Sequence, residues 1–347
     1  MVPVFDGHND ALTREDHALL ASGRDGGHLD LPRMRAGGVR GAIFAVFTPS
    51  DGGAREVQVP RGDGVIEFES APPVEHAVAA ADATAAAGRL LALERAGAVQ
   101  VARCGADLDR AVDDLDGPPV AVLHLEGAEA IDPGLESLDL WYSAGLRSIG
   151  PVWSRPNAFA HGVPFISPSS PDTGPGLTDA GRALVRRCGE LGIVIDVSHL
   201  NEAGFWDVAR LEAGPIVASH SGVHALCPTS RNLLDSQLDA IRDSGGLVGI
   251  VFAVSFLRPD FADDPNTPLS LIAEHARYVA DRIGVAHVAL GSDYDGATIP
   301  ASLGDVAGTP KLLEALSSAG FSESDVSAIA WGNWRRVLGA WWGNPPG

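Results

Sequence analysis

Runs of mostly apolar residues recur along the chain at intervals typical of alternating strands and helices. The runs are continuous, which is typical of parallel strands buried on both faces, whereas half-exposed antiparallel strands alternate. The pattern therefore predicts a parallel sheet. We expect its eight strands at residues 2–5, 39–47, 119–125, 146–152, 193–197, 215–219, 246–252 and 287–290.

Helical patterns lie between these runs. One begins at a capping Thr178 and ends before Gly192, and the last begins with a capping-box-like pair, Ser322 and Asp325. A (β/α)8 barrel closes with eight parallel strands that alternate with helices, and the chain has eight strand candidates. We therefore predict an α/β fold of the TIM-barrel type. The clearest predicted helices are residues 74–96, 178–191, 269–283 and 322–342.

Three long irregular stretches follow predicted strands, at residues 48–73, 154–176 and 253–268. Because parallel strands end on the same side of a barrel, these loops should rise together over its C-terminal face. A chain of 347 residues with 45% hydrophobic content can fill one such barrel with loop insertions. We therefore expect a single domain over residues 1–347.

The net charge of −20 argues against nucleic acid or an anionic membrane as a partner, because both surfaces are themselves negative. The three cysteines, an odd number without a close pair, suit a reducing compartment and offer no thiolate metal cluster. The chain passes from Met1 into the first predicted strand without a leader pattern, and no apolar stretch approaches the length of a membrane span. We expect a cytoplasmic protein. The sequence is compatible with a homodimer.

Polar residues that can bind metal follow five of the predicted strands. Catalytic residues of (β/α)8 barrels lie at these C-terminal strand ends, so the side chains should converge. His8 and Asp10 are two residues apart and would share one face of an extended segment. The strand-end residues are His8, Asp10, Glu126, His199, His220 and Asp293.

Five of these residues form a set of nitrogen and oxygen ligands without sulfur, which suits Zn²⁺ and, less specifically, Mn²⁺, Fe²⁺ or Co²⁺. Five ligands are too many for one open tetrahedral site, but they fit two ions about 3.5–4 Å apart if one carboxylate bridges them. Glu126 is the candidate bridge, because it lies between the His8/Asp10 pair and the later His199 and His220. A hydroxide held between two such ions would be a strong nucleophile, so the pattern indicates a hydrolytic site.

The sequence leaves two nearby aspartates undecided. Asp295 either supports the site from behind or caps a following helix, and Asp196 either faces the helix layer or positions a ligand. The remaining histidines at predicted helix, loop or strand-start positions are interpreted as structural. They are His17, His28, His76, His124, His224, His275 and His287.

Six motifs follow one another along the chain. They are Phe5-Asp6-Gly7-His8-Asn9-Asp10, Leu125-Glu126-Gly127, Asp196-Val197-Ser198-His199, Ser219-His220-Ser221, Gly291-Ser292-Asp293-Tyr294-Asp295-Gly296 and Gly332-Asn333-Trp334-Arg335-Arg336-Val337. In this order they resemble the motifs of the membrane (renal) dipeptidase family of the amidohydrolase superfamily. The resemblance runs from residue 5 to about residue 338.

The resemblance implies a (β/α)8 barrel with two zinc ions, the first bound by His8, Asp10 and Glu126 and the second by Glu126, His199 and His220. It also implies that Asp293 contacts the bridging water and moves a proton to the leaving amine. By the same resemblance, Arg231 holds the terminal carboxylate of the substrate, a task that suits the planar fork of a guanidinium.

One position departs from the family pattern. Better-known members have a histidine after the fourth strand that contacts the carbonyl oxygen under attack, and the matching residue here is Trp153. An indole can donate one hydrogen bond but cannot carry positive charge, so oxyanion stabilisation is weaker or comes from another group, with Arg155 and His161 as candidates. The alternative interpretation is that Trp153 forms an aromatic wall of the substrate pocket.

The leading hypothesis is a dinuclear zinc dipeptidase that hydrolyses small dipeptides through a metal-bridging hydroxide. The alternative is a related amidohydrolase that acts on N-acyl amino acids or another small amide or ester, such as a lactone. A third hypothesis, a metal-free scaffold that keeps the fold, is disfavoured because all five ligands are present.

Overall fold

Eight parallel strands form the centre of the protein, within residues 2–50, 58–60, 63–68 and 71–343, which the computed structural model describes. One sheet runs in the order β1-β2-β6-β7-β9 and a second in the order β10-β11-β12. These strands are β1 (Val4–Asn9), β2 (Val39–Phe47), β6 (Val120–Glu126), β7 (Leu146–Gly150), β9 (Val194–Ile195), β10 (Val217–Ser221), β11 (Leu247–Ile250) and β12 (Val288–Leu290).

Isolated parallel bridges join the two sheets into a closed ring. Asp196 pairs with Val217 between β9 and β10, and the Val197 amide donates to the Val217 carbonyl at 2.8 Å. Asn9 pairs with Tyr294 beyond β12, and the Asp10 amide donates to the Tyr294 carbonyl at 2.8 Å. The predicted (β/α)8 barrel is therefore confirmed, with the predicted strands in their expected order.

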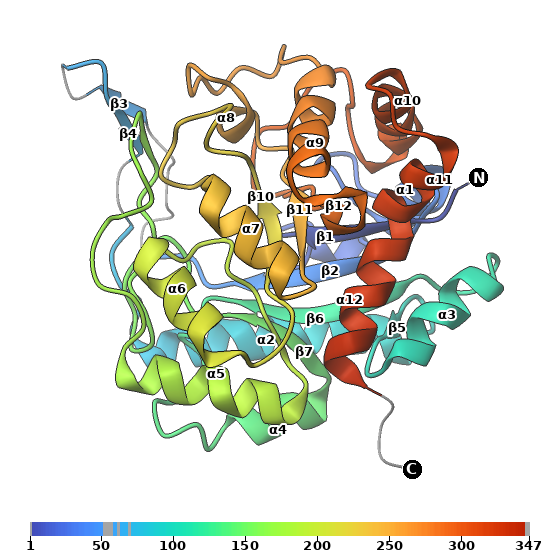
Figure 1. Ribbon diagram of the computed structural model, residues 1–347. Coiled ribbons are helices and arrows are strands. Elements are labelled where there is room, and N and C mark those ends of the chain that lie inside the picture. Colours follow the sequence, from blue (N-terminus) through green and yellow to red (C-terminus); the bar gives the residue numbers. More distant parts are fainter. Residues whose placement is uncertain (1, 51–57, 61–62, 69–70, 344–347) are drawn as a thin grey trace.

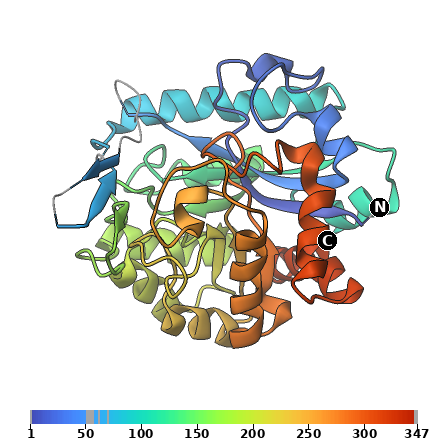
Figure 2. The same cartoon turned by 90° about the horizontal axis from the view of Figure 1, so that it is seen from above.

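Helices surround the strands, as the view from above shows (Figures 1 and 2). The helices are α1 (Leu31–Ala36), α2 (His76–Arg95), α3 (Gly105–Asp113), α4 (Leu138–Ala144), α5 (Asp179–Leu191), α6 (Glu202–Leu211), α7 (Asp235–Asp243), α8 (Val254–Leu257), α9 (Ser270–Ile283), α10 (Thr309–Ser318), α11 (Glu323–Ser327) and α12 (Asn333–Trp342). Short 3-10 turns lie at η1 (His17–Leu19), η2 (Val285–His287) and η3 (Val306–Gly308), and β5 (Gln100–Val101) pairs with the start of β6. No helix in the described part of the chain is both long and apolar enough to cross a membrane.

The caps predicted from the sequence are present. The Thr178 hydroxyl accepts from the Gly181 amide at 3.0 Å, and α5 ends at Gly192 with a left-handed φ of 71°. Ser322 and Asp325 form the predicted capping box at the start of α11. These local signals fix where the helices begin and end.

The predicted helix at residues 322–342 is confirmed as an uninterrupted helical stretch from residue 323 to residue 342. It contains a π-helical turn, η4 (Ala328–Gly332), between α11 and α12, which the sequence did not predict. Around this turn both Trp331 and Trp334 contact Phe5 of β1, with ring centroids 5.8 and 5.4 Å apart. A Cβ on Gly7 would lie 2.4 Å from the Trp334 ring, so β1 needs glycine there to admit the indole.

The long loops were predicted to be irregular, but they contain a small antiparallel sheet. Strand β3 (Gln58–Pro60) pairs with β4 (Ile66–Phe68), and β4 pairs with β8 (Ile166–Ser167). The β3–β4 hairpin projects to one side of the barrel (Figure 1). Parts of the predicted 48–73 loop, at residues 51–57, 61–62 and 69–70, lie outside the described residues.

Candidate active site

The first two candidate ligands lie side by side at the end of β1. His8 Nε2 is 3.7 Å from Asp10 Oδ2 and 3.5 Å from Glu126 Oε1 at the end of β6. His8 is fully buried, yet neither of its ring nitrogens has a hydrogen-bond partner among the described residues, and Asp10 Oδ1 has none either. Buried polar atoms without partners are costly, so they indicate a place for a ligand.

Glu126 lies at the centre of three imidazoles. Its Oε1 is 2.9 Å from His199 Nε2 and 3.6 Å from His220 Nε2, in addition to its contact with His8. Burial alone would raise the pKa of Glu126, but His8 and His199 outweigh it and hold that pKa well below the ordinary value. The carboxylate is therefore ionised, as a metal ligand must be.

The donor set fits divalent transition metals. His8, Glu126 and His220 each offer a ligand atom, and these atoms lie within 4.8 Å of one another, as do those of His8, Asp10 and Asp293. All the donors are nitrogen or oxygen, and several have no hydrogen-bond partner in the described part of the chain. These residues could hold Zn²⁺, Mn²⁺, Fe²⁺ or Co²⁺.

Serine hydroxyls support the outer nitrogens of two of these histidines. His220 Nδ1 is 2.7 Å from Ser219 Oγ, and Ser219 Oγ in turn donates to the Asp196 carboxylate. His199 Nδ1 is 2.9 Å from Ser154 Oγ. These contacts leave Nε2 of both rings facing Glu126, and they resolve the open question about Asp196 in favour of positioning a candidate ligand.

His124 was interpreted as structural, but it lies directly beneath the candidate ligands. Its Nδ1 is 2.9 Å from Ser148 Oγ, and its Nε2 is 3.8 Å from Asp196 Oδ2. His124 precedes Glu126 by two residues, the same spacing that joins His8 to Asp10. That repeated His-x-acid spacing on one strand face was the signal that sequence reasoning missed.

Asp293 lies where a proton donor and acceptor would be expected, in the wall of the cavity that also reaches Glu126. Burial raises the pKa of Asp293 to about 7, with Asp10 and Glu126 adding to the shift while His8 and Arg231 oppose it. A carboxyl group with a pKa near neutrality can both accept and release a proton.

The backbone around Asp293 is left-handed, with φ of 60° at Asp293 and 70° at Asp295. The Asp293 amide donates to the His8 carbonyl at 3.0 Å, which holds the turn against β1. A Cβ on Gly296 would lie 2.2 Å from Asp10 Oδ2 and 2.4 Å from Asp293 Oδ1. The glycine therefore allows the two carboxylates to approach the same place.

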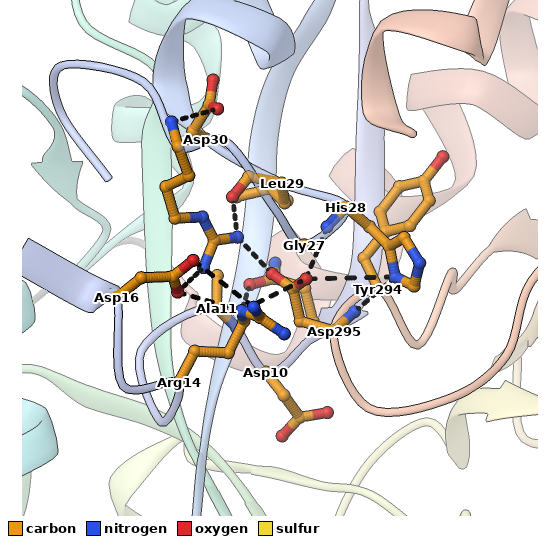
Figure 3. A network of polar contacts seen from close by, with 12 residues as sticks. Asp10, Ala11, Arg14, Asp16, Gly27, His28, Leu29, Asp30, Tyr294 and Asp295 are labelled. Atoms are coloured by element: carbon orange, nitrogen blue, oxygen red, sulfur yellow. Dashed lines mark hydrogen bonds and ion pairs between the residues drawn. The ribbon is translucent and has the colours of Figure 1, made fainter. Parts of the chain in front are cut away.

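Asp295 joins two loops of the barrel mouth, as Figure 3 shows. Its carboxylate accepts from the His28 amide at 2.6 Å, pairs with Arg24, and lies 3.9 Å from Arg14 Nε. Arg24 also contacts Asp16 at 3.1 Å. No helix begins at Asp295, so the helix-cap alternative is wrong and the residue supports the site from behind.

Arg231 is buried beside the candidate ligands. Its Nη1 donates to Ser221 Oγ and its Nη2 to the His220 carbonyl, both at 2.9 Å, and Nη2 lies 3.3 Å from His199 Nε2. Its Nε is buried without a hydrogen-bond partner among the described residues. Burial lowers the pKa of Arg231 to about 10, so the guanidinium remains charged at neutral pH.

Trp153 lines the cavity, with its ring centroid 5.7 Å from that of His199. The two groups considered as substitutes for the family histidine do not line this cavity. Arg155 instead donates to Glu129 Oε1 at 3.0 Å and to the Thr48 carbonyl at 2.7 Å. Of these three groups, Trp153 is the one that lines the cavity.

A (β/α)8 barrel with histidines and carboxylates gathered at its strand ends is an arrangement typical of metal-dependent hydrolases. The membrane dipeptidase model (peptidase family M19) matches residues 1–341, so the chain belongs to that family. Its class is that of the metal-dependent dipeptidases.

Known proteins are similar over most of the chain. A protein of Klebsiella pneumoniae, described as uncharacterized in the pqqA 5′ region, is 48% identical over 247 residues, which cover 71% of this chain and 90% of the relative. The solved structure of dipeptidase AC, a metallo peptidase, has 45% identity and a TM-score of 0.90 and covers 99% of each chain. A metallo peptidase from Rhodobacter sphaeroides, liganded with a phosphinate mimic of the dipeptide L-Ala-D-Ala, has 44% identity and a TM-score of 0.91, covering 98% of this chain and 99% of that one.

Proposed function

We propose that this chain is a dinuclear zinc dipeptidase, with Glu126 as the ligand shared by both ions. The first ion would be held by His8 and Asp10 with Glu126, and the second by His199 and His220 with Glu126. The observation that carries this proposal is the position of Glu126 Oε1, which lies within 3.6 Å of Nε2 of all three histidines.

Divalent ions bound there would lower the pKa of a water molecule and polarise the carbonyl of the scissile bond. Asp293 would accept the proton from that water and deliver it to the leaving amine, because its raised pKa suits both transfers. Trp153 closes the site on the side of His199 and has one indole N–H to offer to a developing oxyanion.

Arg231 is proposed to bind the free carboxylate of the dipeptide. Its Nη groups are anchored on Ser221 and the His220 carbonyl, so the guanidinium is held in one orientation next to His199. A charge-assisted hydrogen bond from a buried, immobilised guanidinium is stronger than a neutral one. The Rhodobacter sphaeroides structure, which holds a dipeptide mimic, supports a substrate of this size.

The alternative substrate is an N-acyl amino acid or another small amide or ester. The replacement of the family histidine by Trp153 favours this alternative. In better-known members that histidine contacts the carbonyl oxygen under attack, so its absence indicates a different substrate. An N-acyl amino acid still carries a free carboxylate, so Arg231 does not separate it from a dipeptide.

The deciding experiment supplies the purified protein with Zn²⁺, measures bound metal by elemental analysis, and assays a dipeptide library beside the matching N-acetyl amino acids. Release of free amino acids from dipeptides, with two ions per chain, is the expected result. Hydrolysis of the N-acetyl compounds alone would establish the alternative. A protein that binds no metal under these conditions would contradict both.

A further inference from the structure

The cavity above the candidate metal ligands has two chemically different walls. It has a volume of about 370 Å³, which lies within the usual range for small-molecule sites. One wall is acidic and includes Asp10, Asp263, Asp293 and Asp295, and the other is aromatic and consists of Phe47, Trp153, Phe165 and Phe256.

The aromatic wall comes from three separate segments of the chain, which are the end of β2, the loop between β7 and β8, and α8. Phe165 makes edge contacts with Trp153 at 5.7 Å and Phe256 at 5.3 Å between ring centroids. Behind this layer, Phe68 and Phe261 pack against each other at 5.3 Å, in the small hydrophobic core that also includes Phe165 and Phe256. The wall is therefore preformed, and a ligand does not have to order it.

Trp153 is also held from outside the cavity. The Arg155 guanidinium carbon lies 5.4 Å from the Trp153 ring centroid and 5.1 Å from that of Phe47. Arg155 is itself fixed by Glu129 and the Thr48 carbonyl. Because the Trp153 ring also lies next to His199, the aromatic surface begins directly beside the candidate reaction centre.

The acidic wall differs in how its charges are compensated. Asp295 is paired with Arg24 and contacts Arg14, so its charge is largely balanced. Asp263 is exposed at the cavity rim and accepts a hydrogen bond from Thr298 Oγ1 at 3.1 Å. A substrate carboxylate other than the one bound by Arg231 would face negative charge at this rim.

We propose that this cavity selects dipeptides with a bulky apolar side chain and rejects dipeptides with acidic side chains. The selectivity rests on the proposed dipeptidase function and names the substrate class within it. Apolar side chains gain contact area on a rigid aromatic surface, whereas an acidic side chain would lose hydration and meet like charge. Phe165 and Phe256 are the residues that determine the apolar preference, and Asp263 contributes to the rejection of acidic side chains.

The test compares kcat/KM of the metal-loaded protein on Ala-Ala with Leu and Phe at either position, and with Glu at either position. The better Leu or Phe dipeptide should exceed Ala-Ala by about 10–100-fold, the range that apolar pockets achieve for added methylenes. The Glu dipeptides should fall below Ala-Ala. Hydrolysis with equal kcat/KM across the series would overturn the proposed selectivity but leave the dipeptidase function intact.

Two substitutions of Phe256 test whether the aromatic wall causes the preference for bulky apolar side chains. Phe256→Ala should lower the ratio of bulky to Ala-Ala turnover toward one, and Phe256→Leu should lower it less if the alanine variant folds poorly. Phe261→Leu is the matched control, because Phe261 packs behind the wall without lining the cavity, and it should keep the ratio. An unchanged ratio in both Phe256 variants would overturn the assignment.

The charge is tested separately. Asp263→Asn should raise kcat/KM on the Glu dipeptides relative to Ala-Ala, whereas Asp243→Asn, at the far end of α7, should not. Equal responses of the two variants would contradict the role of Asp263. If the metal-loaded protein hydrolyses no dipeptide in the series, the dipeptidase function itself fails and the selectivity falls with it.

Discussion

The Ser219 hydroxyl lies 2.7 Å from Nδ1 of His220, its neighbour in the chain, and donates its own proton to Asp196. An Asp196 carboxylate can only accept, so the direction of the chain is fixed: His220 Nδ1–H donates to Ser219, and Ser219 donates to Asp196. This arrangement leaves His220 Nε2 unprotonated and directed at Glu126. In many metal sites a carboxylate contacts the ligating histidine directly. Here Ser219 lies between His220 and Asp196 and relays that hydrogen bond.

We expect Ser219→Ala to weaken metal binding by about 10–100-fold, because outer hydrogen bonds orient a ligand and fix its tautomer. Metal affinity is measured by chelator competition, independently of turnover. Ser244→Ala is the control, because Ser244 Oγ makes its hydrogen bonds to the backbone groups of Ile216, Ile241 and Gly246, before β10 and β11 begin and away from the candidate ligands. Equal affinities of wild type and Ser219→Ala would show that the hydroxyl does not position His220.

Glu126→Gln should lower the occupancy of both ions together. Glu126 is the residue whose oxygen lies near His8, His199 and His220 at once, and an amide is a much weaker ligand than a carboxylate. The measurement is metal content after dialysis, with Asp10→Asn as the comparison, which should affect mainly one ion. If Glu126→Gln loses only one ion, Glu126 is not the ligand shared by both ions.

The sequence predicted the barrel and its strand ends because the relevant signals are local. A continuous apolar run followed by His8-x-Asp10 or Glu126 is visible without knowing which strands are adjacent. The same rule was not applied to His124, whose spacing from Glu126 repeats the pattern, so its place beside the candidate ligands was missed. Local signals of this kind carry most of the fold and the candidate ligand set.

Relationships across strands could not be predicted in the same way. The Ser219–Asp196 contact depends on the register between β9 and β10, which a single sequence does not give. The Asp295–Arg24 pair joins residues 271 positions apart, through a loop with no periodic pattern. The π-helical turn at Ala328–Gly332 is likewise set by packing of Trp331 and Trp334 on Phe5, and local helix propensity does not reveal it.

Asp293→Asn should keep the metal but lower kcat by about 10²–10⁴-fold, because an amide cannot carry a proton from water to the leaving amine. The substitution preserves size, so the left-handed turn and its hydrogen bond to the His8 carbonyl should survive. Steady-state kinetics and elemental analysis on the same preparation separate the two effects. Near-normal kcat at full metal content would exclude Asp293 from proton transfer.

We expect the stability of the protein to depend on pH through His275, which is buried in α9. Its Nδ1 accepts from the Val223 amide at 3.0 Å and its Nε2 donates to the Leu257 carbonyl at 3.1 Å, so the neutral ring satisfies both partners. Burial lowers the pKa of His275 to about 4, despite the opposing hydrogen bond to Leu257.

Between pH 4 and about 6.5, the unfolded chain therefore binds one more proton at His275 than the folded chain does. The free energy of unfolding should fall as pH decreases through this window, by up to about 3 kcal/mol from this residue. His275→Gln offers the same acceptor and donor without titrating, so its unfolding free energy should depend less steeply on pH. Urea unfolding of both proteins at matched metal content from pH 4.5 to 7.5 measures the difference, and parallel curves would show that His275 does not contribute to acid sensitivity.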